Sequence, residues 1–308
     1  MMIARWMNLM ALLLMPLLLT GIIGRVKSLW AGRRGPPILQ PTYDVIRLLR
    51  KSSVYSSTTT PLFRIAPWVF LVTALGSGVV TPLLGAEPLR SFPFDFVWFA
   101  YVWALGRVAI MLAGLDTGSS FEGMGVAREA TFSTLLEPAL FLVLGALCLS
   151  SGAHTLGEAL APHLRSGDAW IVVRTLAVIT LFIVLQVETA RMPVDDPSTH
   201  LELTMVHEVM VLDHSGPELA AIQYGSAVKL HVGAAVVATL LNPWAGASGP
   251  LPAVVNLALS ALIAILIGTI ESLIARLRLR TVPKYIAVAL ASAAVALLAT
   301  AWRDGGAR

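Results

Sequence analysis

Charged side chains are scarce in this sequence. Asp, Glu, Lys and Arg make up 13% of the 308 residues, while 56% of the residues are hydrophobic. A typical soluble domain carries about 25% charged residues, so the mean hydropathy of +0.78 excludes an ordinary soluble protein and indicates a polytopic membrane protein. No polar stretch is long enough to bury a core of its own. We therefore expect residues 1–308 to form a single, all-α membrane domain.

Cysteine is almost absent as well. The single Cys148 lies in an apolar run, so no disulfide can form within the chain. Without a Cys-x-x-Cys pair, the chain cannot hold an iron–sulfur cluster through its own thiolates. We expect no cofactor to be bound by this chain, so that any electron carriers lie in other subunits. The isoelectric point of about 9.5 is not a nucleic-acid signal, because the positive charge is gathered beside apolar runs.

Long apolar runs are abundant. A helix needs about 20 mostly apolar residues to cross a bilayer, and eight runs qualify. The first run lacks a small-residue cleavage site and is followed by others, so we expect it to be retained as a helix. The expected spans are residues 3–24, 65–86, 94–115, 132–151, 169–189, 219–241, 252–274 and 284–302.

The distribution of positive charge predicts the orientation of the chain. The basic loop 25–64 and the basic segment 275–284 fall on the same side of eight spans. The positive-inside rule makes that side cytoplasmic and places both termini outside. The acidic loop 190–218 then also faces the cytoplasm. Residues 41–52 are expected to form a short amphipathic helix in the interface plane, against the lipid bilayer.

The stretch from Val187 to Glu208 combines many charges with two histidines, directly after an apolar run. Thr199 and Glu202 have the spacing of a capping box, which predicts a helix from Thr199. Such charges at the mouth of a span favour proton handling or partner docking, although a solvated helix face is the simpler alternative. His207-Glu208 begins like a zinc motif, but Val211 stands where the second histidine is needed, so we expect no metal site.

Several ionisable residues fall inside the apolar runs. Glu137 directly precedes Pro138, which is expected to kink the helix. Each such charge needs a partner or a water-lined cavity, although Arg107 and Glu271 could instead reach the interface by snorkelling. The candidate proton or coupling path is Glu137, Glu188, Arg191, Asp195, Asp196, Glu202, Glu208 and Lys229.

Two further segments carry candidate binding residues. Arg33 to Pro37 forms a rigid basic turn that contacts lipid headgroups or docks an acidic soluble partner. The glycine-rich run 118–125 is expected to be a loop, but it lacks the G-x-G-x-x-G order of a nucleotide site. The candidate docking residues are Arg25, Arg33, Arg34, Gly35, Pro36, His200 and His207.

Taken together, these motifs resemble a known family. The first loop, R-V-K-S-L-W-A-G-R-R-G-P-P, and the stretch E-T-A-R-M-P-V-D after the fifth span are similar to subunit 1 of respiratory complex I. The continuation D-P-S-T-H-L-E-L-T-M-V-H-E looks closer to the membrane subunit of energy-converting, group 4 nickel–iron hydrogenases, including formate hydrogenlyase and hydrogenase-4 complexes. So do L-D-T-G-S-S-F-E-G-M-G and I-E-S-L-I-A-R-L-R-L-R.

The resemblance implies a non-catalytic membrane anchor and coupling subunit in a bacterial or archaeal cytoplasmic membrane. Its implied partners are the hydrogenase large and small subunits, which carry the nickel–iron and iron–sulfur centres, and antiporter-like membrane subunits that move protons or sodium. Ser198 and His200 stand at positions that are acidic in the complex I protein, which favours the hydrogenase branch. A quinone-site subunit of a complex I-type enzyme and a stand-alone ion transporter are the alternatives, but no inverted repeat supports the latter.

Overall fold

The computed structural model describes residues 2–161, 168–195 and 205–305, and the helices found there confirm the expected all-α fold. In chain order they are α1 (Met2–Trp30), α2 (Gln40–Leu49), α3 (Pro61–Val80), α4 (Asp95–Asp116), α5 (Ser120–Ser151), α6 (Leu156–Leu160), α7 (Asp168–Glu188), α8 (His207–Met210), α9 (Gly216–Leu241), α10 (Leu251–Leu273) and α11 (Val282–Gly305).

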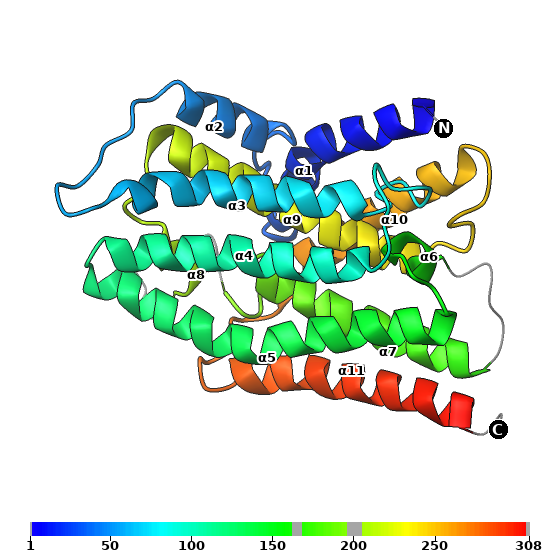
Figure 1. The fold of residues 1–308 in the computed structure, drawn as a ribbon. Helices are drawn as coiled ribbons and strands as arrows, with labels where there is room; N and C mark the ends of the chain where they lie inside the picture. The colour runs from blue at the N-terminus through cyan, green and yellow to red at the C-terminus, as the bar shows by residue number, and fades with distance from the viewer. Residues whose placement is uncertain (1, 162–167, 196–204, 306–308) are drawn as a thin grey trace.

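Eight of these helices are long and apolar enough to cross a membrane. They are α1, α3, α4, α5, α7, α9, α10 and α11, and each corresponds to one expected span. They form a bundle with both chain ends at the same end (Figure 1). We call this the termini end, and we call the opposite end, which holds α8 and the turn between α4 and α5, the loop end.

The helices on either side extend into the expected basic loop 25–64. Helix α1 continues to Trp30, so that Arg25 belongs to its last turns, and Arg64 lies in the first turn of α3. A helix does not stop at its first cation, because a long basic side chain can extend its charge toward water while its stem stays on apolar surface. The non-helical part of this loop is therefore shorter than expected.

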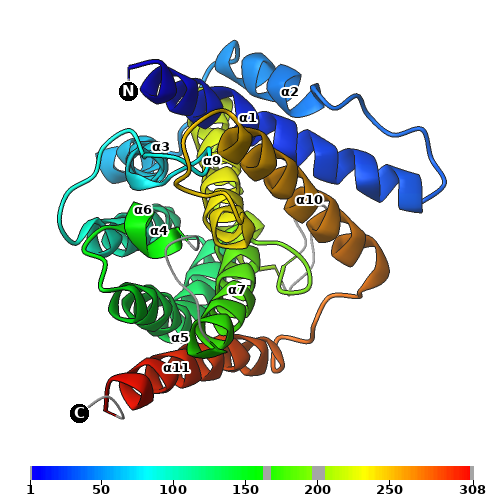
Figure 2. The same ribbon diagram turned by 90° about the vertical axis from the view of Figure 1, so that its right-hand side faces the viewer.

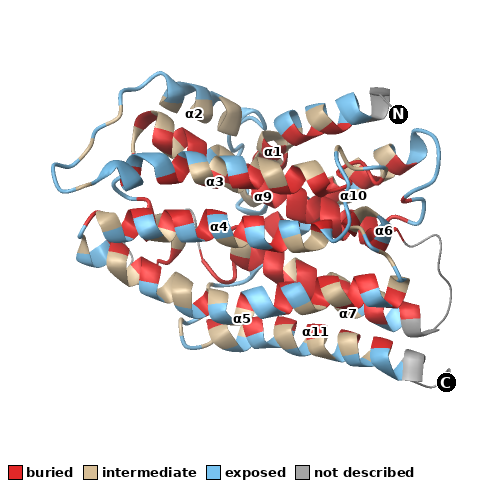
Figure 3. Cartoon of the chain, in the orientation of Figure 1, coloured by how far each residue is buried: buried red, intermediate tan, exposed pale blue. Residues whose placement is uncertain are grey.

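Helix α9 occupies the centre of the bundle. It contacts α1, α3, α7 and α10 and is surrounded by them in the view along the bundle (Figure 2). Its buried residues run along nearly its whole length (Figure 3). Two glycines permit this packing: a Cβ added at Gly225 would lie 2.8 Å from the ring of Phe70, and one at Gly233 would lie 3.3 Å from the Trp103 ring.

The glycine-rich run 118–125, expected to be a loop, is mostly helical, and one of its glycines has a packing role. The chain is helical from Ser120 onward, so most of this run is the first turn and a half of α5. A Cβ added at Gly125 would lie 2.9 Å from the carbonyl oxygen of Val206 and 3.0 Å from the Met210 side chain. The glycine thus allows α5 to approach the segment that carries α8.

The expected amphipathic helix is confirmed as α2, with Pro41 in its first turn. It packs against α1 and α9, whereas its position relative to the membrane interface stays a prediction. The segment that follows is fastened to the loop end of α9, because Ser53 and Tyr55 both donate hydrogen bonds to Glu218. The start of the helix expected from Thr199 lies outside the described residues. Met205 and Val206 are not helical, and the short helix α8 begins only at His207.

Candidate functional site

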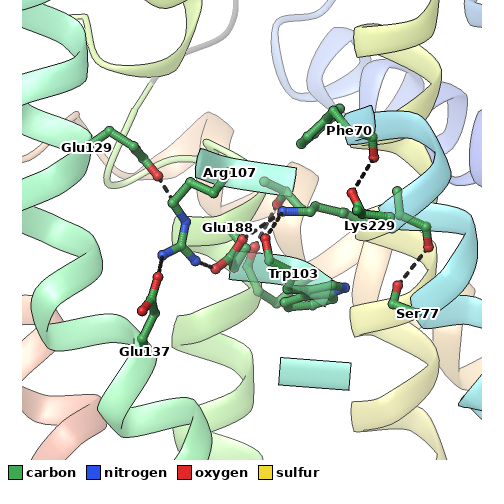
Figure 4. Close-up of polar contacts among 12 residues, drawn as sticks. Phe70, Ser77, Trp103, Arg107, Glu129, Glu137, Glu188 and Lys229 are labelled. Atoms are coloured by element: carbon green, nitrogen blue, oxygen red, sulfur yellow. Dashed lines mark hydrogen bonds and ion pairs between the residues drawn. The ribbon is translucent and has the colours of Figure 1, made fainter. Parts of the chain in front are cut away.

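Arg107 of α4 is the centre of a buried ion network (Figure 4). Its Nη1 donates to Oε1 of Glu137 at 2.7 Å, and its Nε lies 3.4 Å from Oε1 of Glu129. Its Nη2 contacts Oε1 of Glu188. The guanidinium therefore faces two carboxylates from α5 and one from the last residue of α7. With only 6% of its side chain exposed, Arg107 does not snorkel, and that alternative is wrong.

Lys229 of α9 extends the network on the side opposite α5. Its Nζ lies 3.2 Å from Oε2 of Glu188 and 3.3 Å from the carbonyl oxygen of Trp103, to which it donates. The same ammonium lies 5.0 Å from the ring centroid of Phe70 and 5.6 Å from that of Trp103, within the range of cation–π attraction. Glu188 consequently bridges the two cations, Arg107 and Lys229.

The network is unbalanced in charge. Two cations, Arg107 and Lys229, face three carboxylates, Glu129, Glu137 and Glu188, which leaves a formal charge of −1 when all five groups are ionised. An uncompensated charge is expensive in the interior of a membrane protein. A cavity of about 10 Å³ beside the network is close to the volume that admits one water molecule. One bound proton would neutralise the formal charge of the described network.

The two ends of the network differ in exposure. The side chain of Glu188 is 2% exposed, whereas that of Glu137 is 47% exposed. Glu137 lines an open hollow of about 390 Å³ between α4 and α5, together with Tyr101 and Phe141. The network thus runs from the core of the bundle to its lateral surface.

A second ion cluster lies at the loop end, three residues beyond Glu188. Oε1 of Glu271 in α10 lies 3.4 Å from Nη1 of Arg191, and its Oε2 lies 3.0 Å from Nζ of Lys27 in α1. The Glu271 side chain is fully buried, so snorkelling is wrong for this residue too. The cluster joins α1, α10 and the segment after α7.

Asp195 forms a third contact point on the same segment. Its Oδ1 lies 2.6 Å from Nη2 of Arg276, and its Oδ2 accepts from the backbone N–H groups of Val206 and His207 at 3.1 and 2.9 Å. The carboxylate therefore joins the segment after α7 to the start of α8 and to the segment after α10.

The predicted coupling residues are brought together only in part. Glu137, Glu188 and Lys229 belong to the network around Arg107, whereas Arg191 and Asp195 belong to the two neighbouring clusters. Glu208 lines a separate hollow of about 250 Å³ between α1, α2 and α9, which Arg191 and His207 also line. Three further candidates lie outside the described residues: Asp196, His200 and Glu202.

The predicted docking residues of the first loop lie at the surface. Arg33, Arg34, Gly35 and Pro36 are exposed. Arg25 donates a hydrogen bond to the carbonyl oxygen of Arg34, which fixes the turn against the end of α1. Among the residues that the structure describes, no three His, Cys, Asp or Glu side chains are grouped so that they could hold a metal ion.

The sequence analysis missed Glu129 and the central position of Arg107. Glu129 precedes Glu137 by eight residues, which separates the two by about 80° around a helix. That spacing places both carboxylates on neighbouring faces of α5 and could have suggested a shared partner. The identity of the partner depends on how α4 packs against α5, and the spacing of residues within α5 gives no information about that packing.

The fold and the buried network define an integral membrane protein of eight membrane-length helices around a charged core. The sequence model of the NADH dehydrogenase family matches residues 3–301, and the chain belongs to that family. It is 30% identical to hydrogenase-4 component C of Escherichia coli over 76% of this chain and 73% of that protein. It is 27% identical to formate hydrogenlyase subunit 4 of the same organism, over 87% and 88% of the two chains.

More distant relatives extend the comparison. The chain is 25% identical to an NADH-quinone oxidoreductase subunit of Methylococcus capsulatus over 72% of its length and 71% of that protein. Its fold is similar to that of a chain in the membrane-bound sulfane sulfur reductase, an archaeal respiratory membrane complex. The TM-score is 0.79 at 18% identity, with 97% of this chain and 99% of the other covered.

Proposed function

We propose that this chain is the membrane anchor and coupling subunit of a hydrogenase-4 or formate hydrogenlyase-type complex. It would link the redox chemistry of a soluble nickel–iron and iron–sulfur arm to the movement of protons or sodium ions. The observation that carries the proposal is the ion network from Glu188 through Arg107 to the half-exposed Glu137. The two relatives named for hydrogenase-4 and formate hydrogenlyase, each matched over more than two thirds of its length, support the type of complex.

The proposed coupling is electrostatic. A redox step in the arm changes the charge near Arg191 and Asp195, which lie close in the chain to Glu188. A unit charge at about 4 Å contributes on the order of 4 kcal/mol at an effective dielectric constant of about 20. That corresponds to roughly a thousandfold change in an equilibrium. Such a change is sufficient to move the one proton that the network can accept, and to pass it toward Glu137.

The arrangement of surfaces supports the proposed partners. The exposed basic turn of Arg33 and Arg34 would dock the hydrogenase large and small subunits at the loop end. The hollow that exposes Glu137 would face an antiporter-like membrane subunit, because a half-exposed carboxylate on the lateral surface is costly against lipid. The proposed location is the cytoplasmic membrane, with the loop end in the cytoplasm and both termini outside.

The proposal is tested in the assembled complex with Glu137→Gln and Asp195→Asn. Both variants should continue to evolve hydrogen, while the number of ions moved per hydrogen falls. Glu87→Gln is the matched control, because Glu87 is exposed at the termini end and lies outside the three clusters. Ion movement that stays fully coupled in both variants would show that these residues do not form the path.

A quinone-site subunit of a complex I-type enzyme is the second candidate function. It is favoured by the hollow of about 250 Å³ that Thr20, Arg191 and His207 line and by the relatives named as subunits of NADH-quinone oxidoreductase. Inhibition of the complex by a quinone analogue would support this function over the first, provided that replacing Thr20 by a bulky side chain removes the inhibition.

A further inference from the structure

A second basic site lies on the side of the bundle where α5 meets the segment before α11. It is an open hollow of about 400 Å³ with mainly apolar walls, formed by Met124 and Phe132 of α5 and by Leu279 and Pro283. Arg128 and Arg280 line the same hollow. It is separate from the ion network, none of whose residues line it.

The hollow lies beside the first turn of α11, a helix long and apolar enough to cross a membrane. The candidate span of α11 starts at Val282, directly beside Leu279, Arg280 and Pro283. Helix α5 has 32 residues and is therefore about 48 Å long, longer than a hydrocarbon core of about 30 Å. Figure 1 shows α11 beginning beside the middle part of α5. In a bilayer, this arrangement would place the apolar wall beside acyl chains and the arginines near the headgroups.

The two arginines present positive charge that the hollow itself does not neutralise. Nη1 of Arg128 donates to the carbonyl oxygen of Met205 at 2.7 Å, and its Nη2 lies 3.0 Å from the sulfur of Met124. These contacts orient the guanidinium. Asp195 attracts Arg128, but Asp195 is itself paired with Arg276, which repels Arg128. No acidic residue is among the described residues that line the hollow. Arg280 is exposed, as are the neighbouring Arg278 and Lys284.

We propose that this hollow binds the headgroup of an anionic phospholipid from the loop-side leaflet. The planar fork of an arginine matches phosphate oxygens in two-point hydrogen bonding. Basic pockets between membrane helices at this level are suited to acidic headgroups. The apolar wall selects a lipid over a free anion, because the partly exposed side chains of Met124 and Leu279 offer surface to the first segments of an acyl chain. The site does not depend on the proposed coupling function.

The test uses the full-length protein, within its complex as purified, in a neutral detergent. Dioctanoyl phosphatidylglycerol is titrated against the thermal midpoint of this chain, with dioctanoyl phosphatidylcholine and inorganic phosphate as parallel probes. A ligand that binds the folded state raises the midpoint in proportion to its affinity. We expect a saturable rise with phosphatidylglycerol alone, and we expect added salt to weaken it.

Arg128→Gln and Arg280→Gln should each weaken the binding of phosphatidylglycerol about tenfold, which is about 1.4 kcal/mol. Arg90→Gln is the control, because this exposed arginine lies near the termini end. If Arg128→Gln fails to fold through loss of its contact with Met205, the exposed Arg280 decides the outcome. An equal response to phosphatidylcholine, an equal response to inorganic phosphate, or affinity unchanged in Arg280→Gln would each overturn the proposal. A partner polypeptide cross-linking to position 280, with no effect of lipid, would overturn it as well.

Discussion

The strongest quantitative prediction concerns the pair formed by Glu188 and Lys229. Both side chains are 2% exposed, and their charged atoms lie 3.2 Å apart. Lys229→Met removes one of the two cations that Glu188 contacts. Glu188→Gln leaves Lys229 without a carboxylate partner in the network and removes one of three carboxylates from Arg107. Each single variant therefore leaves one member of this buried pair without its partner, whereas the double variant removes both partners.

The magnitude follows from the geometry. At 3.2 Å and an effective dielectric constant of about 20, the attraction is about 5 kcal/mol. Removing one partner of a buried pair typically costs about 3–5 kcal/mol, whereas replacing both is much cheaper. We expect each single variant to lower the free energy of unfolding by about 3 kcal/mol or more. The double variant should lie at least about 2 kcal/mol above the value that additivity predicts.

The assay is equilibrium unfolding of the full-length protein in mild detergent, followed by circular dichroism, for the two single variants and the double. Arg90→Gln combined with Glu188→Gln is the control, because Arg90 is exposed near the termini end and lies outside the three ion clusters. Those two effects should add within about 0.5 kcal/mol. If the effects of Lys229→Met and Glu188→Gln also added within about 0.5 kcal/mol, the inference that the two side chains stabilise each other would be refuted.

Two other predictions concern the loop end. Gly125→Ala should destabilise the protein by about 1–3 kcal/mol, because its Cβ would crowd the carbonyl oxygen of Val206, whereas Gly123→Ala, which meets nothing within 4 Å, should be neutral or stabilising. Burial lowers the pKa of His214 from 6.5 to about 4, so the contribution of this residue to stability should fall as the pH drops from about 6.5 toward 4, by about 2 kcal/mol at pH 5. The contribution is measured as the difference between the wild-type protein and His214→Phe: the thermal midpoint of the wild type should fall relative to that of the variant between pH 7 and pH 5.

The eight spans were predictable because length and hydropathy alone determine whether a helix can cross a bilayer. The residue that ends a helix was less predictable. The apolar run of α1 gives way to Arg25 and Lys27, yet the helix continues to Trp30 because Lys27 reaches the buried Glu271. The glycine-rich run 118–125 resembled a loop, yet it is largely helical, and Gly125 allows the close approach of α5 to the segment that carries α8.

The sequence was sufficient to predict which charged residues of the candidate site would be costly to bury, but not which of them would pair with one another. A buried charge in an apolar run demands a partner, which was sufficient to single out Glu137 and Lys229. The choice of partner depends on the rotation of four helices about their axes. Arg107 and Glu188 are 81 residues apart, and no local pattern in the sequence connects them. Snorkelling failed for Arg107 for the same reason, since only the packing of α4 shows that it faces the core.

The ion network around Arg107 and the two loop-end clusters are linked by one short segment of the chain. Glu188, Arg191 and Asp195 lie within eight consecutive residues, and each pairs with a different part of the bundle: Glu188 with Arg107 and Lys229, Arg191 with Glu271, and Asp195 with Arg276. A displacement of this short segment must therefore alter all three sets of contacts together. Because Glu188 contacts both cations of the network, the proposed coupling would pass through this segment on its way from the loop end to Glu137. Apolar residues of similar volume are often as stable as a buried ion pair, so stability alone does not account for this shared arrangement.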